Sequence, residues 1–195
     1  MKVALVARSV FPLHGYGGLE RHVYDLARAL AERHVEVTLI TQPPSAGREW
    51  SPESIHPSVR AEFVPYHTFP GAGRRGTTVL DRSTAYPLFG LRAGRRALDL
   101  VRQGKADIVH GLGASVLGYA RARLRARRDG SGALVGPGAG GATAPLVLNP
   151  QGLEEFGATD PGRAPLKRAA YLPLRKSVLI CAAAAHISTD RRSGR

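Results

Sequence analysis

Residues 1–31, MKVALVARSVFPLHGYGGLERHVYDLARALA, decide the fold class. They begin with a short apolar run, residues 2–7, of the kind found in strands that are buried on both faces of a parallel sheet. A glycine-rich turn over residues 15–18 follows. Residues 19–34 then place their apolar side chains at helical spacing. Strand, glycine turn and helix in this order predict the first unit of an α/β sheet.

The same alternation continues along the chain. Four more apolar segments are predicted as strands, at residues 35–41, 59–66, 106–110 and 146–149, with a final short strand at 186–189. Three more segments are predicted as helices, at residues 85–103, 115–127 and 166–184, the last kinked or divided at Pro173. Residues 67–84 and the glycine-rich residues 129–145 are predicted as loops. The pattern indicates a doubly wound, mainly parallel, Rossmann-like sheet in a single α/β domain.

The chain of 195 residues carries a formal net charge of +13, which favours anionic partners. Nucleic acid is the least favoured of these, because the few aromatic residues are not interleaved with the basic runs. Acidic lipid headgroups and phosphate-bearing substrates both stay open as partners. One helix is rich in arginine and is expected either to meet acidic lipid or to be solvated; its arginines are Arg121, Arg123, Arg125, Arg127 and Arg128.

No targeting segment or membrane-spanning run is recognisable in the sequence. The longest late apolar run, residues 178–185, is far shorter than the roughly 20 residues that cross a bilayer. The predicted location is therefore the cytoplasm, with the inner face of the membrane open as a peripheral site. The single cysteine, Cys181, is expected to be an inert core thiol.

The best candidate for a binding site is the glycine-rich turn with Gly15, Gly17 and Gly18. Glycines let a ligand approach the backbone, and the following helix N-terminus suits phosphate. Glu20 replaces the third glycine of a dinucleotide fingerprint, and the second strand ends at Thr41-Gln42 without an acidic residue, so NAD binding is disfavoured. The alternative is a tight turn that needs glycine only for its backbone angles.

His110 closes the fourth predicted strand and is the candidate catalytic residue, suited to hydrogen-bonding a hydroxyl or moving a proton. The alternative to a catalytic role is a structural one, in which the ring is hydrogen-bonded within the core or to a neighbouring backbone carbonyl. Gly152, Glu154 and Glu155 follow the fifth strand as candidate substrate-binding residues, or as solvated loop residues. Because parallel strands end at one edge of a sheet, Gly17, Gly18, His110 and Gly152 are predicted to converge. No zinc-ligand set appears, and no metal or cofactor is expected.

Several of these segments together resemble the N-terminal domain of family 4 glycosyltransferases. They are residues 17–23 (GGLERHV), 26–30 (LARAL), 107–111 (DIVHG), 145–156 (PLVLNPQGLEEF) and 182–190, in that order. The resemblance implies two facing Rossmann-like domains of the GT-B type. It assigns residues 1–190 to the acceptor-side domain and residues 191–195 to a polar tail, and it implies that the C-terminal donor-binding domain is absent here.

The resemblance also implies a retaining transfer of sugar from a nucleotide sugar to a sugar or lipid-linked acceptor. Gly17 and Gly18 are then expected near the donor diphosphate and His110 near the reacting sugar. Three explanations for the missing donor-binding domain stay open: a fragment, a truncated reading frame, or a split enzyme whose second domain is supplied by another chain. Two positions depart from the family's pattern, where histidine is common: Leu112 and Gln151. The chain alone is expected to be inactive. The competing interpretation is a stand-alone Rossmann-like module that binds a phosphorylated or anionic ligand without catalysis.

Overall fold

The computed structural model describes residues 1–44, 50–66, 78–128, 144–150 and 169–186. These residues form one parallel sheet whose strands are β1 (Lys2–Val6), β2 (Glu36–Thr41), β3 (Val59–Phe63), β4 (Ile108–Leu112) and β5 (Leu146–Asn149). The strand order is β3-β2-β1-β4-β5, and every neighbouring pair is parallel. The order reverses between β1 and β4, which confirms the predicted Rossmann-like sheet and makes this pair the topological switch point.

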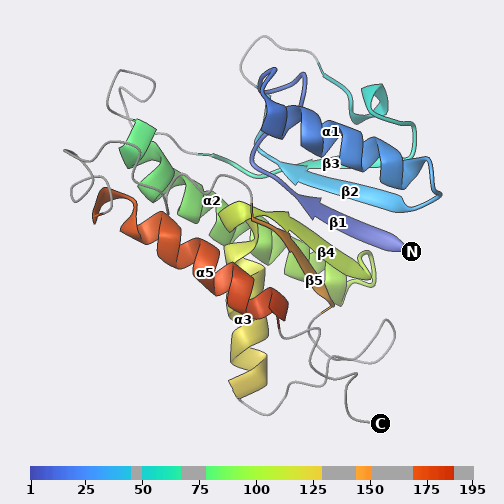
Figure 1. The fold of residues 1–195 in the computed structure, drawn as a ribbon. Coiled ribbons are helices and arrows are strands. Elements are labelled where there is room, and N and C mark those ends of the chain that lie inside the picture. The colour runs from blue at the N-terminus through green and yellow to red at the C-terminus, as the bar shows by residue number, and fades with distance from the viewer. Residues whose placement is uncertain (45–49, 67–77, 129–143, 151–168, 187–195) are drawn as a thin grey trace.

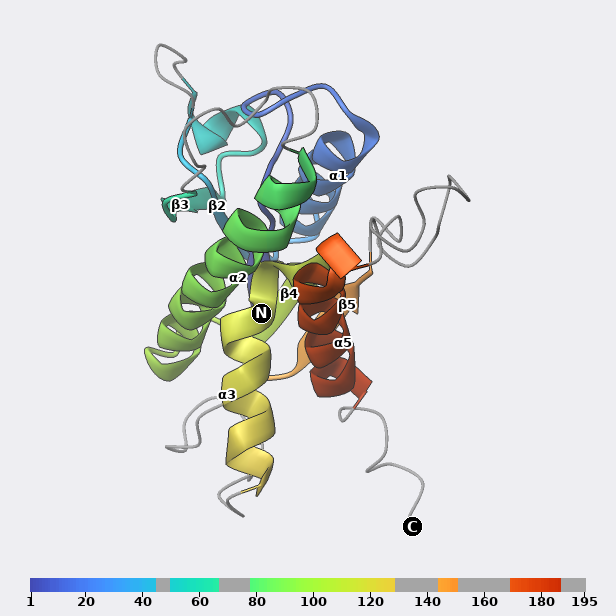
Figure 2. The same ribbon diagram turned by 90° about the vertical axis from the view of Figure 1, so that its left-hand side faces the viewer.

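Helices cover both faces of the sheet (Figure 1). One face carries α1 (Gly18–Ala31), and the other carries α2 (Thr78–Arg102), α3 (Leu117–Arg128) and α5 (Leu172–His186). Single turns of 3-10 helix lie at Pro52–Ser54 and Gly113–Val116. Figure 2 shows α2, α3 and α5 next to one another on their side of the sheet.

The sheet separates two cores, because successive strand residues point to opposite faces. The α1-side core contains Val3 and Leu5 of β1 together with Val23 and Ala27 of α1. The α2-side core contains Ala4 and Val6 of β1 together with apolar side chains of the other three helices, among them Phe89, Tyr119 and Cys181. Cys181 is buried there, as the sequence predicted, and burial raises its pKa to about 12.

One helix boundary differs markedly from the prediction. The start of α2 lies at Thr78, so residues 78–84 are helical rather than loop, and Pro87 lies inside the helix. Ser83 and Ala85 are buried in this segment, and Ser83 Oγ donates to the carbonyl oxygen of Ala170 at 2.5 Å. Tertiary packing against the segment before α5 therefore outweighs the cost of a proline within a helix.

The predicted last helix, residues 166–184, is divided just before Pro173, as the sequence indicated: residues 169–170 are helical, and Tyr171 interrupts the helix. The first residue of α5 is Leu172, which places Pro173 in the first turn, where a missing N–H costs nothing. His186 is the last residue of this helix and does not begin a strand. The rest of the predicted final strand lies outside the described residues.

Arg123 is not part of the basic surface that the sequence suggested for α3. Its side chain is only 3% exposed. Its guanidinium donates to the carbonyl oxygens of Ala144 at 2.6 Å and Ala184 at 3.1 Å, and so joins α3 to α5 and to the segment before β5. Burial lowers the pKa of Arg123. The other four arginines of this helix are exposed.

Candidate functional site

The carboxyl ends of β1 and β4 are tied together by one buried hydroxyl. Ser115 Oγ donates to the carbonyl oxygen of Val6 at 2.7 Å and accepts from the N–H of Leu112 at 3.1 Å. This bridge fixes the edge of the sheet at which β1, β4 and β5 end. Ligands of open parallel sheets bind outside that edge, at the switch point.

The glycine-rich turn lies between β1 and α1 at this edge, and none of its glycines has a left-handed backbone. Gly17 is the N-cap of α1, with φ −70° and ψ 165°, angles that any residue adopts. A Cβ at Gly17 would lie 2.5 Å from Oε2 of Glu20, whose carboxylate accepts a hydrogen bond from Ser9 Oγ at 3.0 Å. Glycine at position 17 therefore makes room for Glu20.

Gly18 differs from Gly17, because a Cβ built there meets nothing within 4 Å. Gly18 is exposed at the first position of α1, and Gly17 supplies no side-chain cap. The first N–H groups of a helix have no intrahelical partner. Neither backbone angle nor internal packing requires glycine at position 18, so the alternative of a purely conformational glycine does not hold there.

The turn is held to the neighbouring strand by His14. Its Nδ1 accepts from the N–H of Val10 at 3.0 Å, and its Nε2 therefore donates to the carbonyl oxygen of Gln42 at 3.0 Å. Burial lowers the pKa of His14. Tyr16 packs edge-on against Phe11 and leaves 77% of its own surface exposed at the tip of the turn.

His110 is in the middle of β4, which begins and ends two residues later than predicted, and it pairs with Leu5 in the register of the sheet. Its place in the strand alternation puts it on the face that α1 covers. The Nε2 atom is buried and has no hydrogen-bond partner among the described residues. The next residue in the chain is Gly111, whose lack of a side chain leaves room for Val116.

Two residues that the sequence analysis did not select complete this cluster. The Nδ2 atom of Asn149, at the end of β5, lies 3.0 Å from Nε2 of His22, which is in the second turn of α1. His22 is also near enough to His110 to lower the pKa of His110. His22 belongs to the GGLERHV segment, and its position on the predicted helix beside the glycine turn was the available signal. We call His22, His110 and Asn149 the switch-point cluster.

The electrostatics of the cluster favour a neutral His110. Burial lowers the pKa of His110, and the neighbouring His22 lowers it further. An amide nitrogen can only donate, so Nε2 of His22 accepts from Asn149 and its proton lies on Nδ1. A neutral His110 with an unpartnered ring nitrogen can accept a proton or a hydrogen bond from a bound hydroxyl.

A positive charge lies at the end of β1. The guanidinium of Arg8 lies over the rings of Tyr66 and Tyr86, 5.6 and 5.3 Å from their centroids, and Nη1 is 3.4 Å from the Tyr66 hydroxyl. Tyr86 in turn donates to the carbonyl oxygen of Leu112 at 3.0 Å. Sequence spacing gave no signal for this cluster, because its members come from three separate segments.

The structure brings Gly15, Gly17, Gly18 and His110 to one region at the switch point. Gly152, Glu154, Glu155 and Gln151 lie outside the described residues. Leu112, at a position where the family often has histidine, is 3% exposed and packs in the α1-side core. Within the described ranges, no group of three or more His, Cys, Asp or Glu side chains is arranged to hold a metal ion.

A parallel sheet in the order β3-β2-β1-β4-β5, with helices on both faces and a histidine cluster at its switch point, defines a Rossmann-like domain, a class whose ligands bind beyond the carboxyl edge of the sheet. The chain belongs to glycosyltransferase family 4, whose family model matches residues 16–187. It is therefore a glycosyltransferase-family domain, for which a sugar donor and an acceptor are the general substrates. Comparison with curated proteins gives no match.

Among the described helices, none combines the length and the apolar character needed to span a bilayer.

Proposed function

We propose that this chain forms the acceptor-binding wall of a retaining glycosyltransferase that takes its sugar from a nucleotide sugar. One observation carries the proposal: the open Gly18 at the start of α1 and the switch-point cluster occur together at the carboxyl edge of the sheet. The His110 ring nitrogen and the first N–H groups of α1 have no partner among the described residues, and they supply an acceptor and donors for a polyhydroxylated ligand.

Within this site, His110 lies nearest the reacting sugar and accepts a hydrogen bond from a substrate hydroxyl. Its depressed pKa keeps it neutral near pH 7, which that role needs. His22 is a positioning residue, since its own Nε2 is already engaged by Asn149. Arg8, fixed against two tyrosine rings, adds positive charge to the side of the cleft that faces the donor phosphates.

The glycine turn contacts the substrate through its backbone at Gly15, Gly17 and Gly18. Glu20 places a carboxylate at the same helix end and is already bonded to Ser9. We expect that carboxylate to receive further hydrogen bonds from sugar hydroxyls, while the N–H groups at the start of α1 donate to donor or acceptor oxygens. Gly152, Glu154 and Glu155, which follow β5 in sequence, are proposed to extend the same surface.

Two titrations test this proposal. The chain, labelled with ¹⁵N, is titrated with nucleotide sugars and with a panel of glycan and lipid-linked acceptors. Ligand-dependent shifts are expected at Gly17, Gly18 and the rings of His22 and His110. Shifts confined to other parts of the chain, or none with any sugar compound, contradict the proposed site. In the proposed reaction the donor-side half of the transition-state environment comes from a second domain, so residues 1–195 by themselves are expected to show no turnover.

A stand-alone binding module for a phosphorylated ligand is the second candidate, favoured by the uncapped start of α1. It is distinguished by fusing the chain to the donor-binding domain of a family 4 enzyme. Transfer that appears in the fusion and falls at least tenfold in His110→Ala supports the acceptor wall. Anion binding at Gly18 with no transfer in the fusion supports the module.

A further inference from the structure

Helices α2 and α3 cross at backbone contact because glycines remove the side chains between them. A Cβ at Gly94 would lie 2.5 Å from the backbone nitrogen of Tyr119, and one at Gly118 would overlap the carbonyl oxygen of Leu91. From this crossing α2 and α3 diverge toward their C-termini (Figure 2). The divergence opens a groove of about 530 Å³ between them.

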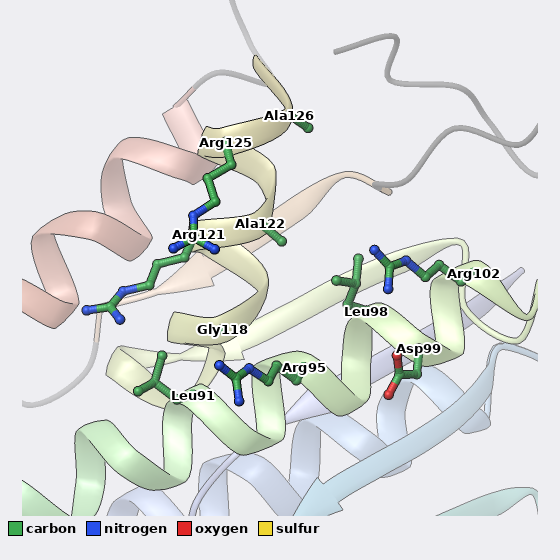
Figure 3. Close-up of a pocket in the computed structure, with 10 residues that line it drawn as sticks. All are labelled: Leu91, Arg95, Leu98, Asp99, Arg102, Gly118, Arg121, Ala122, Arg125 and Ala126. Atoms are coloured by element: carbon green, nitrogen blue, oxygen red, sulfur yellow. The ribbon is translucent and has the colours of Figure 1, made fainter. Parts of the chain in front are cut away.

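The groove has an apolar floor and a basic rim (Figure 3). Leu91 and Leu98 of α2 and Ala122 and Ala126 of α3 supply the apolar surface. Two arginines come from each helix: Arg95 and Arg102 from α2, and Arg121 and Arg125 from α3. Asp99 is the only acidic side chain among the lining residues. We call this surface the arginine groove.

The four arginines are exposed, and no hydrogen bond or ion pair joins them to another side chain within the described residues. Helix dipoles account for part of this pattern, because cations are favourable in the last turn of a helix. Arg102 is in the last turn of α2 and Arg125 in the last turn of α3. Arg95 and Arg121 are further from the helix ends and have no such reason to be basic.

The arginine groove is separate from the switch-point cluster. Its helices are on the face of the sheet opposite α1. In addition, α2 ends at Arg102, shortly before β4 begins at Ile108. The part of the groove near Arg102 therefore lies toward the amino ends of the strands. A ligand in the groove is therefore not the sugar substrate of the candidate site.

We propose that the arginine groove binds a phosphate group. Guanidinium groups pair with phosphate oxygens through parallel N–H donors. The four positive charges of the arginines that line the groove exceed the single negative charge of Asp99. The apolar floor accommodates the part of the ligand that carries the phosphate. The volume falls within the range of small-molecule sites, roughly 300–1,000 Å³. The phosphate comes either from a soluble compound or from an anionic lipid headgroup.

The test compares two double variants of the full chain with equal net charge. In Arg95→Gln/Arg121→Gln the groove loses one arginine from each helix. In Arg92→Gln/Arg127→Gln each helix loses an exposed arginine that does not line the groove. Affinity for inorganic pyrophosphate is measured by calorimetry at two salt concentrations. Sedimentation is measured with vesicles of phosphatidylcholine containing phosphatidylglycerol. Circular dichroism confirms that both variants fold.

We expect the groove variant to lose at least tenfold in affinity and the control variant less than twofold. A groove-specific loss with pyrophosphate assigns a soluble phosphate compound, and a groove-specific loss with vesicles alone assigns the lipid headgroup. Equal losses in the two variants overturn the proposal, because they indicate an effect of net charge alone. Failure of the unaltered chain to bind either probe also overturns it. Neither result bears on the acceptor-binding role.

Discussion

The amide of Asn149 donates a hydrogen bond to Nε2 of His22 at 3.0 Å, across 127 positions of sequence. This bond joins the end of β5 to the second turn of α1 and fixes the His22 ring beside His110 on the intervening strand. The order of the sheet makes the contact possible, because β4 and β5 lie on the far side of β1 from β2. The switch-point cluster is thus a product of tertiary topology.

Replacing His22 by Gln is expected to raise the pKa of His110. The neighbouring His22 lowers the pKa of His110, and its removal relieves that effect. The pKa should stay below its ordinary value, because burial is the larger cause. The ring resonances of His110 followed by NMR between pH 4 and 8 give this value. An unchanged or lower pKa would show that the two rings do not interact. His34→Asn, at an exposed turn, is the control.

The stability of the chain should fall as the pH drops below about 6.5, the ordinary value of an unfolded histidine. Burial lowers the folded pKa of both His14 and His110. At a pH between the folded and the unfolded pKa of these histidines, the unfolded chain binds more protons than the folded chain. The free energy of unfolding therefore rises with pH across this range, and the contribution of the two histidines is fully present above the unfolded pKa. Urea unfolding at several pH values between 5 and 7.5 measures this slope. His110→Gln should make the slope shallower, and an equally steep slope in that variant would assign the effect elsewhere.

Alanine at Gly18 and alanine at Gly94 should have opposite effects on stability. Gly18→Ala meets open space and removes freedom from the unfolded chain, so the expected change is a gain of no more than about 1 kcal/mol. Gly94→Ala forces apart α2 and α3 and is expected to cost about 3 kcal/mol. Thermal and urea unfolding of both variants check these values.

The same pair separates structure from function at the glycine turn. If Gly18 is open because substrate approaches it, Gly18→Ala should weaken ligand shifts at the switch-point cluster in the folded chain. A fully folded Gly18→Ala variant with unaltered sugar binding would remove Gly18 from the proposed site.

Replacing Arg123 by Ala should destabilise the fold by about 2–4 kcal/mol, because it leaves the carbonyl oxygen of Ala184 without its buried side-chain donor and that of Ala144 with only the Tyr119 hydroxyl. Arg127→Ala, an exposed change on the same helix, should stay within about 0.5 kcal/mol. The free energy of unfolding in urea distinguishes the two. Equal effects would mean that the charge of α3, and not the buried contact, determines stability.

The sequence predicted the order of strands and helices because its apolar runs and helical periodicities are local signals. It misplaced the start of α2, since Pro87 reads as a helix-start residue when the packing of Ser83 is unknown. It placed Arg123 among surface arginines because spacing along α3 does not reveal which side meets α5.

The candidate site was predicted in part. The rule that parallel strands end at one edge gives the place of the glycine turn with Gly17 and Gly18. His110 was expected to close β4 and instead lies in the middle of that strand, and the roles of all three residues stay predictions. Asn149 and Arg8 could not be selected, because the side chains that surround them come from segments far apart in the chain.

The two cores also differ in when a growing chain can complete them. Among the described residues, the buried members of the α1-side core run from Val3 to Val59 and otherwise include only Leu112, with Ile108 packed against them, whereas the α2-side core reaches from Ala4 to Ala184. During synthesis one face of β1 and β2 can therefore be covered early, while the opposite face waits for α5 to leave the ribosome. For that interval the nascent chain presents an apolar sheet surface, and we expect chaperones to engage it there.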